Sequence, residues 1–403
     1  MRFRFFLAII LQLLGALAAR AQPVLALREA ALPGGRGTMK YALILPEPFD
    51  PVKPVPVLLA LPPGDQSEAM MREGLKRYWS AGALRGWAIV APIAPPETDF
   101  ATSDSAVFAL LLEDVRTRVL VRGGKFHLAG PSNGGRAALH LARLRPDWFA
   151  SVLVLPGFLP SAADEKGLEA MRGVNVAMLI GSADADWLGP SRRTRDLLRA
   201  AGVRTTFTIL EGQGHVLDVS PDTLFTMLEE ADALADPSSN LAKVNAALDD
   251  LHDAAAKADE ARYFRRFSRS AVFLGTDATE RWTKAEFQTW AKPYFARGRA
   301  WVYTPRDRHV FFSADGATAW FDEFVDNEKL GACRGTGVLV LEDGEWRIAQ
   351  YHLVIPVPND LATDLVSKAR DLEKKAAAGE KPSEKSAPGS RPAAPTPPAA
   401  GPK

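Results

Sequence analysis

The sequence predicts an α/β domain with a mostly parallel sheet, followed by a second domain of the α+β class. From about residue 38 to 235, short apolar runs alternate with helix-length segments. Near-continuous apolar strands separated by helices are typical of a parallel sheet that is covered on both faces. After a polar stretch with a proline at 236–240, the pattern changes to helices followed by alternating strands. A chain of 403 residues has room for both domains.

The first domain is expected to span residues 22–236. Its strands are expected at 41–45, 55–61, 88–91, 126–129, 151–155, 175–180 and 206–210. Helical patterns lie between the later strands, near 104–121, 134–145, 190–202 and 221–235.

The second domain is expected to span residues 241–360. It begins with a helix whose apolar side chains share one stripe, at Val244, Leu248, Leu251 and Ala255. Alternating runs then flank Asp315-Gly316 and Asp343-Gly344. An Asp-Gly pair between alternating runs is typical of a β-hairpin, so these runs predict an antiparallel sheet. A last helix is expected at about 361–376.

The two ends of the chain have compositions of their own. Residues 1–21 have a basic start, an apolar run and the small-x-small site Ala19-Arg20-Ala21, which is the order of a secretory signal peptide. The apolar run is shorter than the ~20 residues of a membrane span. We therefore expect export to the periplasm or the extracellular space, without a stable membrane anchor. Residues 377–403 are rich in Pro, Ala and charge, which predicts a disordered tail.

Charge and cysteine content exclude several classes of protein. Basic and acidic residues nearly cancel to a net charge of +1, so no overall field favours nucleic acid or anionic lipid. Cys333 is the single cysteine, which excludes an intrachain disulfide framework and a cysteine-rich metal site. His252, His309 and His352 show no spacing typical of metal ligands.

One serine of the first domain lies in a pattern that displays nucleophiles. Ser132 stands in Gly130-Pro131-Ser132-Asn133-Gly134-Gly135, after an expected strand and before a helix-forming segment. In a Gly-x-Ser-x-Gly elbow, a sharp strand-to-helix turn has room only for small neighbours and raises the serine oxygen above the sheet. A serine in an ordinary turn is the alternative interpretation.

A serine nucleophile requires a base, and the base requires an acid that orients it. In sheets of this type the three residues follow in the order Ser, Asp, His. His215 follows the last expected strand in a glycine-flanked loop, whereas His127 and His140 are out of order and are expected to be structural. Asp184 follows the preceding strand and is the expected acid, with Asp186 in reserve. Aspartates that only cap or solvate a loop are the alternative.

An oxyanion hole requires two backbone N–H donors. Asn133, directly after the serine, is expected to supply one of them. The other is expected from the loop Pro62-Pro63-Gly64-Asp65-Gln66. Because proline has no N–H, Asp65 is the expected donor, with Gln66 and Gly64 as alternatives.

On these residues, the segment 38–235 resembles the α/β-hydrolases, nearest to the esterase, phospholipase/carboxylesterase and polyhydroxybutyrate-depolymerase-like branch. The resemblance rests on G-P-S-N-G-G, on the G-S-A-D segment that ends at Asp184 and on the G-Q-G-H segment that ends at His215. It implies a triad of Ser132, Asp184 and His215, no cofactor, and a small-molecule or lipid-like ester as substrate. Many relatives carry His-Gly where this chain has Pro63-Gly64, so the oxyanion geometry departs from theirs.

Residues 241–360 resemble the SnoaL-like branch of the nuclear transport factor 2-like family. The resemblance rests on "LDDLHDAAAKADEARYFRRF", "AVFLGTDATERWTKAEF", "TAWFDEF" and "WRIAQYHL". It implies a curved sheet folded around helices, with a cone-shaped pocket. Members of this family range from isomerases and hydratases to domains that only bind a ligand or dimerise, so the fold does not determine the function.

Aromatic side chains are the candidates for lining such a pocket. They are Trp282, Trp290, Tyr294, Trp301 and Trp320, with Asp277, Asp322, Arg308 or His352 as candidate polar groups. The favoured alternative is that the aromatic residues form the core and the charged groups are solvated.

The sequence therefore supports three hypotheses. The first is an exported serine hydrolase that cleaves carboxylic esters through an acyl-enzyme, with a second domain that binds a ligand or forms a homodimer. The second is a non-catalytic binding protein with a vestigial hydrolase site. The third, an isomerase or hydratase in the second domain, ranks last because no acid–base pair is identified there.

Overall fold

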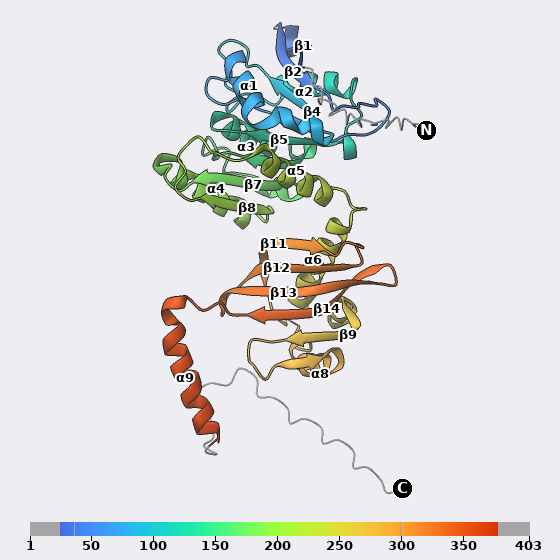
Figure 1. Cartoon of the computed structure of the whole chain (residues 1–403), viewed down its shortest axis with the longest axis vertical. Helices are drawn as coiled ribbons and strands as arrows, with labels where there is room; N and C mark the ends of the chain where they lie inside the picture. The colour runs from blue at the N-terminus through green and yellow to red at the C-terminus, as the bar shows by residue number, and fades with distance from the viewer. Residues whose placement is uncertain (1–24, 36, 299, 378–403) are drawn as a thin grey trace, which may run out of the picture.

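The computed structural model describes residues 25–35, 37–298 and 300–377, which form two domains stacked end to end (Figure 1). The expected signal peptide lies outside these ranges, as does the expected tail from residue 378 onward. Within the described residues, no helix is long and apolar enough to cross a membrane.

The N-terminal domain is built on a mostly parallel sheet. Among the described residues its eight strands have the order β1-β2-β4-β3-β5-β6-β7-β8. Only β2 runs antiparallel to its neighbours, β1 and β4. The strands are β1 (Leu25–Ala31), β2 (Thr38–Ile44), β3 (Val57–Ala60), β4 (Ala88–Pro92), β5 (Phe126–Gly130), β6 (Phe149–Val154), β7 (Asn175–Gly181) and β8 (Thr205–Leu210). This is the expected α/β-hydrolase sheet.

Helices cover both faces of this sheet. They are α1 (Glu68–Gly74), α2 (Ala106–Arg116), α3 (Asn133–Leu144), α4 (Ala185–Ala200) and α5 (Pro221–Ala235). Successive residues of β3 point to opposite faces of the sheet and pack into separate hydrophobic cores. Leu59 belongs to the core that contains Phe108, and Leu58 to the core that contains Trp79 and Phe225. Burial on both faces explains why the strands read as continuous apolar runs.

Two features of this domain differ from the prediction. Strand β1 was not expected, because its Ala-rich segment has a low β-propensity. Helix α4 begins at Ala185 rather than near residue 190. The Gly189-Pro190 pair indicates a helix break, yet Pro190 lies inside the helix, where it removes one intrahelical hydrogen bond.

The C-terminal domain contains the second sheet, with the strand order β10-β9-β14-β13-β12-β11. Its strands are β9 (Phe267–Leu274), β10 (Arg281–Thr283), β11 (Thr304–Phe312), β12 (Thr318–Asn327), β13 (Gly331–Glu342) and β14 (Glu345–Val354). Its helices are α6 (Asn240–Ala256), α7 (Glu260–Arg265), α8 (Lys284–Phe295) and α9 (Asn359–Ala377). Both expected hairpins are present. The four strands expected here pair antiparallel, but the sheet is mixed, because β9, which was not expected, pairs parallel with β14. Hairpin signals report only strands that are neighbours in sequence, and these two are not.

Aromatic rings fill the interior of the curved sheet. Tyr263, Phe264, Phe287 and Phe295 are buried there, and partly buried side chains pack against them at Trp282, Trp290 and Trp301. This arrangement supports the core-packing interpretation of the aromatic residues.

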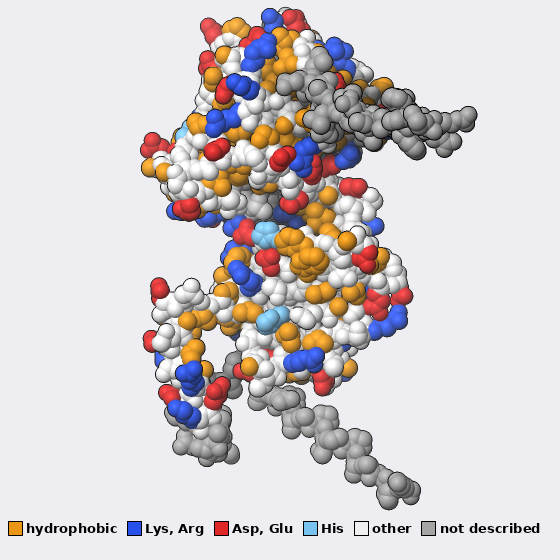
Figure 2. All heavy atoms as spheres, in the orientation of Figure 1, with side chains coloured by type: hydrophobic (Ala, Val, Ile, Leu, Met, Phe, Trp, Pro, Cys, Tyr) orange, Lys and Arg blue, Asp and Glu red, His pale blue; other side chains and the backbone are white. Residues whose placement is uncertain are grey.

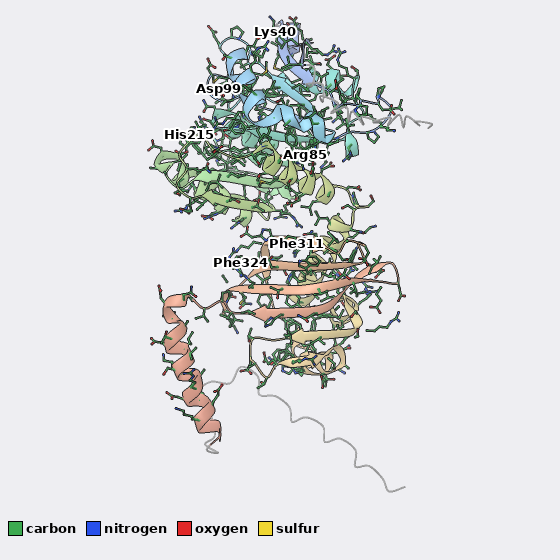
Figure 3. The ribbon with its side chains drawn as sticks, viewed as in Figure 1. Lys40, Arg85, Asp99, His215, Phe311 and Phe324 are labelled. Atoms are coloured by element: carbon green, nitrogen blue, oxygen red, sulfur yellow. The ribbon has the colours of Figure 1, made fainter. Side chains whose placement is uncertain are left out.

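Trp320 is not part of this interior, so neither interpretation, a pocket lining or the core, holds for it. It is 46% exposed and stacks on Phe311 on the outer face of the sheet, where apolar side chains gather (Figures 2 and 3). The strand alternates, and the neighbouring Ala319 and Phe321 are the buried residues. Asp322, two residues after Trp320, lies on the same outer face. His352 lies on this face too, because it pairs with Thr336, which also pairs with Asp322.

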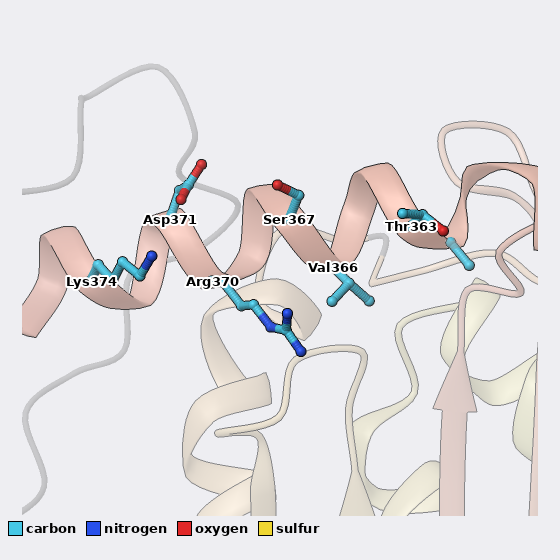
Figure 4. Close-up of a pocket in the computed structure, with 7 residues that line it drawn as sticks. Thr363, Val366, Ser367, Arg370, Asp371 and Lys374 are labelled. Carbon is cyan, nitrogen blue, oxygen red and sulfur yellow. The ribbon is translucent and has the colours of Figure 1, made fainter.

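Helix α9 extends from the end of β14 along the side of this domain, away from the N-terminal domain (Figure 1). Its apolar side chains are exposed, at Leu361, Leu365, Val366 and Leu372. A hollow beside the helix is lined by Thr363, Val366, Ser367, Arg370, Asp371 and Lys374 (Figure 4). We assign no chemistry to this hollow, because its lining comes from one exposed helix.

Candidate active site

The serine singled out in the sequence lies on a strained turn between β5 and α3. Ser132 has φ 56° and ψ −122°, a backbone conformation that is unfavourable for a residue with a side chain. It is half-buried, directly before the first residue of the helix. Backbone strain of this kind persists where the surrounding structure enforces it.

The glycines around Ser132 are required by close backbone contacts. A Cβ on Gly130 would lie 2.3 Å from the backbone carbon of Gly134, and one on Gly134 would lie 2.3 Å from the Leu61 carbonyl oxygen. A Cβ on Gly135 would lie 2.4 Å from the Pro156 carbonyl oxygen. No side chain fits at these distances, so the G-x-S-x-G-G pattern reflects the packing of the elbow against neighbouring strand ends.

The structure brings Ser132, His215 and Asp184 together in one hydrogen-bonded line. Ser132 Oγ lies 2.8 Å from His215 Nε2, and His215 Nδ1 lies 2.8 Å from Asp184 Oδ2. The Asp184 side chain is 7% exposed and that of His215 is 36% exposed. Figure 3 places His215 near the start of α4, and Asp184 directly precedes that helix. With Nδ1–H donated to the carboxylate, Nε2 is free to accept the serine proton.

The other candidates for these roles lie elsewhere. Asp186 is exposed on the first turn of α4. His127 is buried between Ser151 and Asp232, with contacts of 2.8 and 3.2 Å. His140 lies 2.6 Å from Asp164. Both histidines are held by structural partners, as expected.

The loops that carry Asp184 and His215 are tied to each other. The Ala183 N–H donates to the Gln213 carbonyl at 2.9 Å, and the Gly212 N–H donates to Ser182 Oγ at 2.9 Å. A Cβ on Gly181 would lie 2.1 Å from the Gln213 carbonyl oxygen. These contacts explain the small residues of the G-S-A-D and G-Q-G-H segments, and they fix the carboxylate relative to the imidazole.

The loop expected to complete an oxyanion hole lies against Asn133. Asn133 is the first residue of α3, so its N–H has no acceptor within the helix. Its side chain donates to the Gly64 carbonyl at 2.9 Å and thereby holds the loop. The Gln66 N–H is engaged with the Pro63 carbonyl at 3.0 Å, which excludes it as an oxyanion donor. Asp65 and Gly64 remain the candidates for the second donor.

Sequence reasoning gave no role to the aromatic wall beside the imidazole. The Trp187 ring meets the His215 ring at 4.6 Å with an interplanar angle of 63°. Phe158 meets Trp187 at 4.8 Å, and the Arg136 guanidinium lies 5.2 Å from the Phe158 ring centre. The Trp187 ring covers one side of the His215 imidazole, and Phe158 backs that ring. The position of Trp187 three residues after Asp184 was the available signal.

The C-terminal domain contains a buried group of paired charges. Glu323 is fully buried and lies 2.8 Å from His252 Nε2 and 2.7 Å from Arg308 Nε. Burial alone would raise the pKa of Glu323, but Arg308 and His252 lower it to about 2. Arg308, expected as a pocket group, is therefore a partner of this carboxylate.

Two further expectations concern metals and the cysteine. In the described part of the chain, no group of three or more His, Cys, Asp or Glu side chains is arranged to hold a metal ion. Cys333 is buried in the core of the second domain.

Comparisons with known proteins bear on both domains. Residues 244–358 match the family model of the SnoaL-like domain. A search of curated proteins finds no match. Among solved structures, a thermostable esterase is 15% identical with a TM-score of 0.41, over 47% of this chain and 54% of that one. A ferulic acid esterase is 18% identical with a TM-score of 0.43, over 52% of this chain and 98% of that one.

The second domain also has similar solved structures. An NTF2-like protein of unknown function from Pseudomonas putida is 11% identical with a TM-score of 0.26, over 29% of this chain and 87% of that one. By the family match and its own sheet topology, the chain combines an α/β-hydrolase fold with a SnoaL-like domain.

Proposed function

We propose that this chain, an α/β-hydrolase fold joined to a SnoaL-like domain, is a serine hydrolase that cleaves carboxylic esters. The observation that carries the proposal is the hydrogen-bonded line from Ser132 through His215 to Asp184, with contacts of 2.8 Å each, at a strained elbow. Nucleophile, base and orienting acid are the three parts that acyl transfer by a serine requires.

In the proposed reaction, His215 Nε2 takes the proton of Ser132 as its Oγ attacks the ester carbonyl. Asp184 stabilises the resulting imidazolium. The N–H of Asn133 and one N–H from Asp65 or Gly64 hold the oxyanion. His215 then gives its proton to the leaving alcohol, and water cleaves the acyl-enzyme with His215 again acting as the base.

Ester hydrolysis by a serine variant tests this proposal. We expect purified wild-type protein to hydrolyse p-nitrophenyl acetate and Ser132→Ala to lose that activity. Ser238→Ala, an exposed serine in the interdomain linker, is the matched control and is expected to match the wild type. Unchanged hydrolysis by Ser132→Ala would remove the mechanism. Parallel assays with p-nitroanilide substrates decide whether amides are cleaved as well.

We also propose that the hydrolase is exported. The proposal rests on the basic start, the apolar run and the small-x-small site at residues 1–21. N-terminal sequencing of the protein from a secreting host is expected to begin at Gln22. Recovery of the uncleaved chain in the cytoplasm would contradict export.

The two rival functions have less support. A vestigial site has no need for the bonds that hold Asp184 against His215 or the Asn133 side chain against the oxyanion loop. For catalysis in the SnoaL-like domain, the buried carboxylate of Glu323 is already paired with His252 and Arg308. We therefore place the chemistry in the first domain.

A further inference from the structure

We propose that the SnoaL-like domain holds Asp184 and His215 in position through two groups of hydrogen bonds to the far ends of the two elements that carry them. We call these two groups of contacts the first and the second grip. This inference rests on the proposed function of those two residues. Helix α4 starts directly after Asp184, and β8 ends just before the loop of His215. β8 faces β11 of the second domain (Figure 1), and Arg199 and Arg204, at the opposite ends of α4 and β8, are bonded to that domain.

The first grip is made by Arg199, in the last turn of α4. Its Nη2 lies 2.5 Å from the carboxylate of Asp307 in β11. The same side chain donates two hydrogen bonds to the carbonyl of Thr205, the first residue of β8, at 3.2 and 3.0 Å. One guanidinium thus joins the end of α4, the start of β8 and the second domain.

The second grip is made by Arg204, directly before β8. Its two terminal nitrogens donate to Asn245 Oδ1 at 2.6 Å and to Asp249 Oδ2 at 3.1 Å. These acceptors lie one turn apart on α6, so they present one face to the arginine. Burial lowers the pKa of Arg204, and the Asp249 carboxylate opposes that shift.

The second grip continues into the core of the SnoaL-like domain. Arg308 donates to Asp249 Oδ1 at 2.8 Å and to Asn245 Oδ1 at 3.1 Å, so it shares both acceptors with Arg204. Arg308 is in turn bonded to the fully buried Glu323. The anchor of β8 therefore runs from Arg204 and Asp249, which are partly exposed, to the buried Arg308 and Glu323.

The edge strand of the second domain is shaped for the first grip. The register of β11 against β12 shifts between Arg306 and His309, which marks a bulge. Within it, Asp307 has a φ of 49°, a strained value for a residue with a side chain. Bulges re-aim side chains, and here the re-aimed carboxylate meets Arg199.

Loss of these contacts is expected to displace His215 although none of the substituted residues contacts the triad. β8 is the edge strand of its sheet, so its start would then be held only from within its own domain, by β7 and by Arg199 of α4 among the described residues. A small displacement of β8 moves His215 away from Ser132, and a misplacement of about 1 Å can cost about 100-fold in rate. Substrate contacts remain, so the effect falls on kcat rather than on KM.

The test compares full-length wild type with Arg204→Ala, Asp307→Asn and the double variant. Arg193→Ala is the matched control: Arg193 is an α4 arginine too, but its bidentate bonds, at 2.9 and 2.7 Å, go to Glu165 in its own domain. Three readouts are taken: kcat and KM on p-nitrophenyl acetate, the rate of fluorophosphonate labelling, and amide hydrogen exchange of peptides covering 205–215.

We expect the double variant to lose about tenfold or more in kcat with KM within about twofold, and to be labelled correspondingly more slowly. Exchange over 205–215 is expected to be faster, whereas the control matches the wild type. If Arg204→Ala does not fold, Asp307→Asn alone serves as the test variant, because it keeps the size of the side chain. A milder loss of kcat is expected from it. Folded variants with unchanged kcat and unchanged exchange would overturn the inference. A wild type that neither hydrolyses nor labels would defeat the proposed function instead, and the exchange comparison still decides whether the second domain holds β8.

Discussion

Replacing Gly134 by alanine tests whether the elbow glycines are required by packing. The added Cβ would lie 2.3 Å from the Leu61 carbonyl oxygen and 2.7 Å from that of Pro62, both of which are backbone atoms. Overpacking typically costs about 1–3 kcal/mol of stability. The contacting atoms belong to the backbone, so no side chain can move aside to relieve the clash. The gain in helix propensity from glycine to alanine is at most about 1 kcal/mol. With an overpacking cost near the upper end of that range, about 3 kcal/mol, and a propensity gain of about 1 kcal/mol, we expect a net loss of roughly 2 kcal/mol.

The matched control is Gly189→Ala in α4. A Cβ there meets nothing within 4 Å apart from its chain neighbours, and the residue lies inside the helix directly before Pro190. Because a proline disfavours helical backbone at a preceding residue with a Cβ, the usual gain from glycine to alanine is offset, and the control is expected to change the stability by less than about 1 kcal/mol.

Thermal unfolding, followed by circular dichroism, measures both variants. For a domain of this size, 1 kcal/mol corresponds to about 2–4 °C, so Gly134→Ala is expected to lower Tm by about 4–8 °C. It is also expected to lose ester hydrolysis, because the shifted turn displaces Ser132 and the Asn133 N–H. A Gly134→Ala protein with the Tm and kcat of the wild type would refute the packing argument.

Two further substitutions test the site and the buried charges. Asp184→Asn is expected to lower kcat by about 10³–10⁴-fold because His215 loses its orienting acceptor, whereas the exposed Asp186→Asn is expected to stay within about twofold; equal losses in ester assays would contradict the assignment. Glu323→Gln leaves His252 and Arg308 without their anion and is expected to cost about 3 kcal/mol at pH 7. Because the folded pKa of Glu323 is about 2 against an ordinary 4.5, this stabilisation is present above pH 4.5 and is lost as the pH falls toward 2. The Tm difference between wild type and variant is therefore expected to shrink from pH 7 to pH 3, and a pH-independent difference would contradict the pairing.

Local patterns predicted the elbow and the order of its partners. The glycines around Ser132 reported a close backbone approach, and the structure has that approach. His215 followed from chain order and its position after a strand. The pattern ranked Asp184 ahead of Asp186 but could not exclude Asp186, because both stand in one short polar segment. Burial of Asp184 and its contact with His215 distinguish the two, and both depend on packing between distant segments.

The contacts of the second domain were largely beyond prediction from sequence. Glu323 pairs with His252, which is 71 positions away, and Arg204 pairs with Asn245 across a domain boundary. Pairings of this kind leave no local period. One signal was available, since Glu323 is two residues from both Phe321 and Val325, shares their face of the strand and therefore had to be an inward-facing charge. An inward-facing carboxylate requires a buried partner.

Active-site labelling tests the central claim most directly. The purified protein without its signal peptide is treated with a fluorophosphonate, and the modified peptide is identified by mass spectrometry. The account predicts a label on Ser132 in the wild type and its loss in His215→Ala, since the base that activates the serine is then absent. Folded wild-type protein that remains unlabelled at Ser132 would contradict the account, because the elbow would then hold its geometry without an activated nucleophile.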